Sequence, residues 1–284
     1  MSEPAESTDE PSHHRDEPSR HRGDPATWAV RVCVIGLLLS QWWKYRFFIF
    51  AAGAYRQITI DDPFFPDVLR EPRVLIAAFL TATVGYVLSF RDTPLRTFLL
   101  SLSLAAVTVM CLHQGGYNDA TFTTMWWANL MTIWLSHRSR REAWATLGPR
   151  AAWLGRLIVS MILLGGAVGK WTPEYWSGEV LYEIYFVDRD FWVFNGLRQW
   201  CDEDTRREIA TWYSRSVVVT ETVFGLTLWA LPRRVASQVG MLLLTSIVVF
   251  SNFLLMSVMA CLIAILAVGL FPVPGRSDGI GVDA

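Results

Sequence analysis

The chain has 284 residues, of which 52% are hydrophobic and 18% are charged, and its formal net charge is −1. Soluble globular domains average about 25% charged residues. A net charge this close to zero also implies no nucleic-acid partner. The first 26 residues hold ten of the charged side chains, so the rest is more apolar still. The composition therefore predicts an all-α fold, a polytopic transmembrane helical bundle that has the lipid bilayer as its partner.

Residues 1–26 are polar, charged and rich in proline, so they cannot bury enough apolar surface to fold. We expect a disordered cytoplasmic tail here, a membrane domain over residues 27–272 and a short C-terminal tail over residues 273–284. Histidines in such a tail are usually solvated, and the four cysteines of the chain show no ligand spacing. The sequence therefore predicts neither a metal site nor a disulfide framework.

Apolar stretches follow, each near the roughly 20 residues that span a bilayer as a helix. The first runs from Trp28 to Ala54 and is interrupted by Lys44, Tyr45 and Arg46, where we expect the helix to end or to bend outward. The other candidates cover residues 74–90, 94–112, 122–136, 151–169, 216–231, 235–250 and 254–271. Together they predict about eight spans.

The positions of the arginines predict how this bundle is oriented in the membrane. If the N-terminus is inside, the inner connections are residues 91–96, 137–150 and 232–234, which are short and contain arginines. This distribution follows the positive-inside rule. The outer connections are then residues 55–73, 113–121 and 170–215, together with a short break at 251–253. We therefore expect a multi-pass protein of the cell membrane with both termini in the cytoplasm.

Residues 171–213 are rich in both aromatic and charged side chains. They are too polar to span a bilayer and too apolar for a solvated loop. Short amphipathic helices that lie on the outer surface fit this composition best. Such a segment is able to cover a cavity that opens beneath it.

Lys170 ends an apolar stretch within the sequence GGAVGKWTPEYWSG, and it is one of two lysines in a chain with 23 arginines. One reading is an interfacial anchor whose ammonium group reaches the headgroups. The other is chemical, because a lysine can lose its proton in an apolar environment and act as a base, whereas arginine cannot. Gly165 and Gly169 form a small-xxx-small pair, for which we expect a closely packed neighbouring helix.

Three further polar residues require an explanation. Glu221 lies five or six residues into an apolar stretch, where it either locks helices together or takes part in chemistry. Asp119 follows the glycines of HQGGYND, at a position typical of a helix N-cap. His113 precedes them and is a candidate general base or hydrogen-bonding partner.

The stretch GGAVGKWTPEYWSGEVLYEIY resembles part of the vitamin K-dependent gamma-carboxylase and of its bacterial relatives, which share the HTTM membrane domain. Lys170, Tyr175 and Gly178 match the family's pattern of a lysine, an aromatic residue and a glycine, and Trp176 lies beside the aromatic position. The stretches GGYND, ETVFGLTLWALPRR and DDPFFP are similar to further parts of the family, so the resemblance covers most of residues 27–272.

In the carboxylase, the lysine is proposed to be the base that couples oxygenation of vitamin K hydroquinone to proton abstraction. The resemblance therefore implies a quinol-linked lyase or oxygenase with Lys170 as base, supported by Glu221 and Asp119, with His113 as a further candidate. A reduced quinone of the vitamin K or menaquinol type is the implied cofactor, and Trp171, Tyr175 and Trp176 are the residues expected to contact it.

Two other functions are open from the sequence. A non-catalytic membrane subunit or scaffold of a redox or assembly complex would use the outer segment for docking, and its Lys170 would lie among headgroups. A small transporter would explain Glu221 inside a span and the break at Ser251 and Asn252, which resembles a discontinuous helix. The enzyme reading predicts that Lys170, Glu221 and Asp119 share one cavity.

Overall fold

The computed structural model describes residues 24–57, 64–188, 191–250 and 253–273, with the side chains of residues 46–57 left out. Most of the two predicted tails, part of the DDPFFP stretch and the break at Ser251 and Asn252 lie outside the described residues. All regular structure in the described part is helical. The longer helices are α1 (Pro25–Gln57), α2 (Pro72–Ser89), α3 (Arg96–Leu112), α4 (Ala120–Arg138), α5 (Trp144–Val168), α9 (Glu203–Thr227), α10 (Arg233–Phe250) and α11 (Met256–Ala267).

Short elements account for the other regular structure among the described residues. They are η1 (Asp67–Leu69), α6 (Pro173–Trp176), α7 (Glu179–Tyr182), the π-helical turn η2 (Glu183–Asp188), α8 (Trp192–Trp200), η3 (Phe253–Leu255) and η4 (Val268–Leu270). Each predicted apolar stretch lies largely in one of the eight longer helices. Within the described residues, five helical segments are long and apolar enough to cross a membrane: α1 up to Tyr45, α2, α5, α10 and the run from η3 to η4. These segments are compatible with a multi-pass membrane protein.

Three of the eight predicted spans are not both long and apolar enough to be among these five segments. α3 is apolar but has 17 residues, and α4 and α9 are not among the five segments. α9 begins at Glu203, 13 residues before the predicted start at Ser216, and its added first half carries charged side chains. The first helix also differs from expectation, because α1 neither ends nor is interrupted at Lys44 but continues to Gln57.

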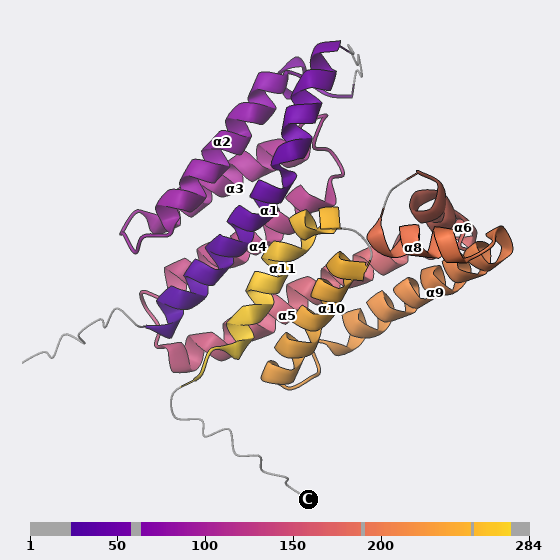
Figure 1. Cartoon of the computed structure of the whole chain (residues 1–284). Helices are drawn as coiled ribbons and strands as arrows, with labels where there is room; N and C mark the ends of the chain where they lie inside the picture. Colours follow the sequence, from indigo (N-terminus) through magenta and orange to yellow (C-terminus); the bar gives the residue numbers. More distant parts are fainter. Residues whose placement is uncertain (1–23, 58–63, 189–190, 251–252, 274–284) are drawn as a thin grey trace, which may run out of the picture.

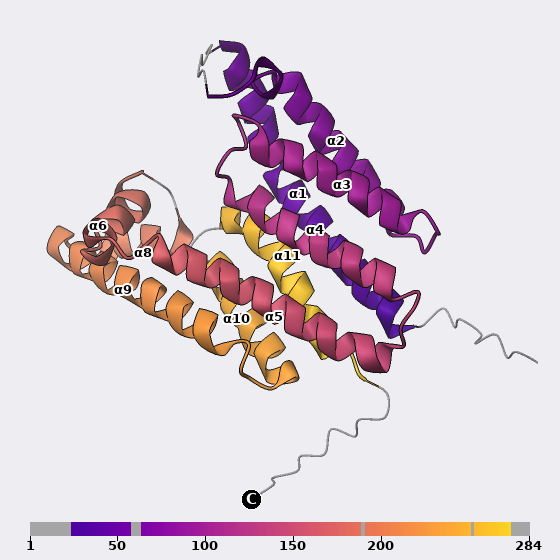
Figure 2. The same ribbon diagram turned by 180° about the vertical axis from the view of Figure 1, so that it is seen from behind.

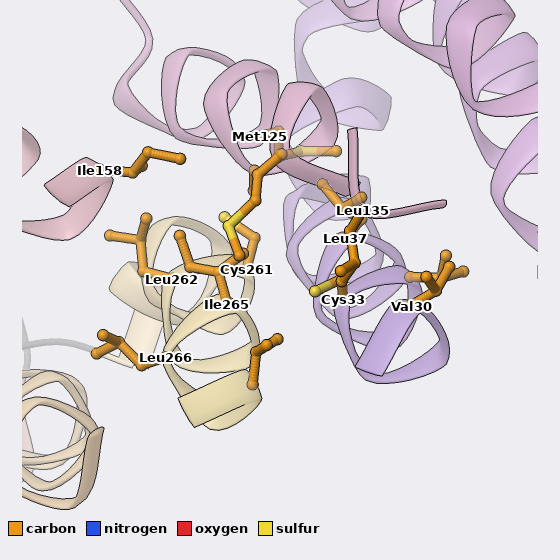
Figure 3. Packing of buried hydrophobic residues seen from close by; sticks show 14 of the residues in the cluster. Val30, Cys33, Leu37, Met125, Leu135, Ile158, Cys261, Leu262, Ile265 and Leu266 are labelled. Carbon is orange, nitrogen blue, oxygen red and sulfur yellow. The ribbon is translucent and has the colours of Figure 1, made fainter. Parts of the chain in front are cut away.

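The core lies where α1, α4 and α11 meet, with buried side chains from each helix (Figure 3). Cys33 and Leu37 of α1, Met125 of α4 and Cys261 of α11 are all 1% exposed or less. α1 and α11 approach closely at Gly36, because a Cβ atom there would lie 2.3 Å from the Cβ of Ala264. Small residues at such contacts let helix backbones pack together without a large hydrophobic driving force.

The bundle has two distinct ends (Figures 1 and 2). The start of α1, the end of η4 and the connections α4–α5 and α9–α10 form one end, here named the terminal end. The connection 113–119 and the short helices α6, α7, η2 and α8 lie toward the other, here named the cap end. A second apolar cluster holds the cap together, with the buried side chains Leu181, Tyr182, Tyr185, Phe186, Phe194 and Ala210.

Candidate functional site

A cavity of about 680 Å³ lies toward the cap end, between α4, α5, α9, α10 and α11. Its deeper wall is apolar and includes Trp127, Met161, Ile162, Val217, Ile247, Val258, Met259 and Leu262. The polar side chains that line it include Lys170 after the end of α5, Glu221 and Tyr213 from the interior of α9, Tyr175 of α6 and Tyr185 of η2. The cavity therefore combines an apolar body with a polar end.

Lys170 and Glu221 form an ion pair at this polar end. The Nζ atom of Lys170 lies 2.5 Å from both carboxylate oxygens of Glu221, so the ammonium group donates to each. Their side chains are 27% and 12% exposed, respectively. The pair joins the end of α5 to the middle of α9, across 51 residues of sequence. Lys170 thus lines a cavity, and its charged group contacts a protein carboxylate.

Gly165 and Gly166, which lie about one helical turn before Lys170, leave space for the ion pair and the cavity. A Cβ atom at Gly166 would lie 3.4 Å from Oε2 of Glu221 and 3.7 Å from Nζ of Lys170. A Cβ atom at Gly165 would meet nothing within 4 Å, because this residue faces the cavity. The expectation that Gly165 admits a closely packed helix was wrong. The close approach lies instead at Gly225, where a Cβ atom would lie 2.6 Å from the side chain of Leu164.

The turn after Lys170 is fixed to α9 by three hydrogen bonds. Ser214 donates to the carbonyl of Tyr175, Thr211 donates to the carbonyl of Ser177 at 2.7 Å, and Arg215 donates to the carbonyl of Trp176 at 3.3 Å. Gly178 closes the turn with a φ of +88°, and a Cβ atom there would lie 2.5 Å from Thr211 N. Since Glu221 lies further along the same helix, these contacts hold Lys170 and Glu221 in register.

The three aromatic residues predicted to contact a quinone are not equivalent. Tyr175 lines the cavity, with Nζ of Lys170 6.0 Å from its ring centroid. Burial, together with the negative charge of Glu221, raises the pKa of the Tyr175 phenol, which therefore stays protonated and can donate a hydrogen bond. Trp171 and Trp176 stack on each other with ring centroids 5.1 Å apart and are not among the residues that line the cavity.

His113 lies away from this cavity, in the connection after α3. Its ring is fully buried, Nδ1 accepts a hydrogen bond from Gly115 N at 3.0 Å, and Nε2 lies 3.0 Å from the carbonyl of Glu71. A ring that accepts at Nδ1 and donates at Nε2 is neutral, and burial lowers the pKa of His113 accordingly. This histidine joins two cap-end connections and is not placed to act on a ligand in the cavity.

Asp119 is also outside the cavity. Its side chain accepts a hydrogen bond from Thr121 N at 2.8 Å, which confirms the predicted N-cap of α4. Its second oxygen lies 2.5 Å from Nζ of Lys44, and the two side chains are 16% and 17% exposed. Lys44, which interrupts the first apolar stretch of the sequence, therefore forms an ion pair that joins α1 to the start of α4. The structure brings Lys170, Glu221 and Tyr175 together but places Asp119, His113, Trp171 and Trp176 elsewhere.

Sequence reasoning missed the tyrosines Tyr185 and Tyr213 and the residues Ser214 and Thr211, which position the turn. Tyr185, Thr211 and Tyr213 lie in the segment 171–213 that was expected to cover the surface, and Ser214 follows it directly. Ala210, Thr211 and Ser214 lie on one side of α9. A predicted helix that began near Glu203 would have shown this side as a buried face. Within the described residues, no group of three His, Cys, Asp or Glu side chains lies close enough to hold a metal ion.

Comparison of the chain with family models, with curated proteins and with solved structures gives no significant match.

Proposed function

We propose that this chain is a multi-pass membrane enzyme in which Lys170 acts as the base toward a lipid-soluble substrate bound in the cavity. A reduced quinone of the vitamin K or menaquinol type is the favoured cofactor, in a quinol-linked lyase or oxygenase reaction related to that of the gamma-carboxylase-like HTTM family. The observation that carries the proposal is the Lys170–Glu221 pair at the polar end of an otherwise apolar cavity.

The membrane placement rests on composition and on the distribution of charge. Besides the five apolar segments, α3, α4 and α9 connect the two ends of the bundle, so the proposal has eight spans, with both termini in the cytoplasm. The described inner connections at residues 90–95, 137–150 and 231–235 contain seven arginines and only two carboxylates, those of Asp92 and Glu142. Such a bias is typical of the cytoplasmic side. The cap then lies at the outer surface.

The cavity fits a reduced quinone in size and in chemistry. A volume of about 680 Å³ lies within the range of pockets that bind small organic ligands. Apolar side chains from α5, α10 and α11 suit a hydrocarbon tail, and Lys170, Glu221 and Tyr175 offer polar groups to a hydroxylated ring. When bound, a reduced quinone supplies acidic hydroxyl protons and the electrons for reaction with oxygen.

The pair gives Lys170 a route to the neutral amine that a base requires. Glu221 accepts one proton from Nζ of Lys170, which converts the ammonium–carboxylate pair into an amine and a carboxylic acid without creating net charge. The free amine is then able to take a proton from a hydroxyl group at the polar end, while the protonated phenol of Tyr175 donates to the developing oxyanion.

The test is formation of quinone epoxide. The purified full chain is placed in nanodiscs with vitamin K hydroquinone or menaquinol and oxygen, and epoxide is followed by mass spectrometry. We expect epoxide from the wild type and at least about a hundredfold less from Lys170→Ala, as is typical for loss of a positioned base. Lys44→Ala is the matched control, since Lys44 has the same pairing at 2.5 Å outside the cavity. Folded protein without activity would contradict the proposal and favour the non-catalytic scaffold.

A further inference from the structure

Arginine side chains join the connections at the terminal end into one surface. Arg140 of the α4–α5 connection donates to the carbonyl of Pro94 at 3.0 Å and also to that of Thr93, both in the α2–α3 connection. Arg156 of α5 donates to the carbonyl of Leu231 at 2.5 Å, in the α9–α10 connection. Three segments that are distant in sequence are thereby held together by guanidinium groups.

The surface that results is strongly basic. We name it the arginine face and define it by seven exposed or half-exposed side chains: Arg91, Arg138, Arg140, Arg141, Arg150, Arg233 and Arg234. Asp92 and Glu142 are the carboxylates in these described connections. Glu142 already contacts Arg138 at 2.8 Å and Arg150 at 3.2 Å, and Asp92 contacts the buried Arg96 at 3.3 Å. The positive charge of the face thus exceeds the negative charge that the same connections supply.

Exposed aromatic side chains surround the same end of the bundle. Trp28, Trp153 and Trp229 are 44%, 50% and 53% exposed. Aromatic side chains of this kind are enriched at the level of lipid headgroups, where one part of the ring is apolar and another is wet. Guanidinium groups just beyond such a belt lie at the depth of the phosphates, and basic surfaces there attract anionic lipids.

We propose that the arginine face is a binding surface for the headgroups of anionic phospholipids in the adjoining leaflet. This inference rests on the membrane placement proposed above but not on the reaction at Lys170. The planar guanidinium fork matches the paired oxygens of a phosphate diester, which makes arginine well suited to this partner. The arginines that bond to carbonyl groups fix the shape of the face, and those that extend from it supply the contacts.

The test is competition between two lipids for the purified full chain in detergent, measured by native mass spectrometry. Phosphatidylglycerol and phosphatidylcholine with identical acyl chains are added in equal amounts. We expect the wild type to retain phosphatidylglycerol preferentially. The triple variant Arg91→Gln/Arg141→Gln/Arg234→Gln, with one change in each connection, should lose that preference by at least about tenfold. None of these three side chains makes the carbonyl contacts described above.

The matched control removes the same number of charges from the cap end, in Arg73→Gln/Arg206→Gln/Arg207→Gln. This control should keep the preference of the wild type. Equal retention of the two lipids by the wild type, or an equal loss in both triple variants, would overturn the inference. Retention of neither lipid would overturn the membrane placement as well. The reaction at Lys170 is tested separately, because none of these arginines lines the cavity.

Discussion

Lys170 and Glu221 depend on each other, since each is largely removed from water and compensates the charge of the other. Replacing one partner of a largely buried pair leaves an uncompensated charge, which costs more than the pair itself contributes. Because Lys170 is 27% exposed, we expect Lys170→Met to lower the free energy of unfolding by about 1–3 kcal/mol, below the usual figure for a fully buried pair.

The double variant Lys170→Met/Glu221→Gln should recover at least half of that loss, because no charge is then left unpaired. Chemical unfolding of the wild type, both single variants and the double variant forms a complete double-mutant cycle. Strictly additive losses in this cycle would contradict the coupling of the two side chains.

His113 makes stability depend on pH. Burial lowers its pKa below the ordinary value of 6.5, so the unfolded chain binds a proton more readily than the folded chain does. Stability is therefore complete above about pH 6.5 and decreases as the pH falls toward the lower pKa of the folded state. We expect the melting temperature of the wild type to fall between pH 7.5 and 5.5, and to fall less in His113→Gln. An identical fall in the two proteins would exclude His113 as the cause.

At the scale of elements, the turn from Thr172 to Gly178 determines where Lys170 lies relative to α9. The left-handed conformation of Gly178 and its contact with the backbone of Thr211 exclude a side chain at this position. We expect Gly178→Ala to destabilise the protein by about 1–3 kcal/mol.

Gly196 in α8 is the matched control, because a Cβ atom there would meet nothing within 4 Å. Gly196→Ala should be neutral or slightly stabilising, since alanine reduces the freedom of the unfolded chain. Thermal unfolding of both variants measures the difference. Equal stability of Gly178→Ala and Gly196→Ala would show that the turn is not held as described.

The sequence was sufficient to predict the helices but not every boundary. Apolar stretches of bilayer length located the eight longer helices. The start of α9 was missed because its first half is charged and lies in the cap, where packing against α6 and α7 decides the conformation. The partners of the two ion pairs also could not be predicted from the sequence. That Lys44 contacts Asp119, and Lys170 contacts Glu221, depends on which helices become neighbours, and no local pattern encodes that choice.

At the scale of the whole molecule, the two ends of the bundle differ: the terminal end carries the arginine face, and the cap end carries the short helices α6, α7 and α8. If the terminal end faces the cytoplasm, Cys201 in the cap lies outside. In a chain whose other three cysteines are replaced by alanine, a membrane-impermeant maleimide added to intact cells should label Cys201. A Ser139→Cys variant of a cysteine-free chain should be labelled only after the membrane is permeabilised. The opposite pattern would invert the proposed orientation.

The central claim is that the cavity holds a lipid-soluble ligand with its polar part against Lys170 and Glu221. Saturable binding of radiolabelled menaquinone to the chain in nanodiscs tests it most directly. Gly165→Leu places a side chain into the open space of the cavity, and Gly196→Leu adds the same side chain at a residue that does not line it. We predict that the wild type and Gly196→Leu bind menaquinone, whereas Gly165→Leu loses at least about tenfold in affinity. Equal binding by all three proteins, or saturable binding by none, would contradict the claim.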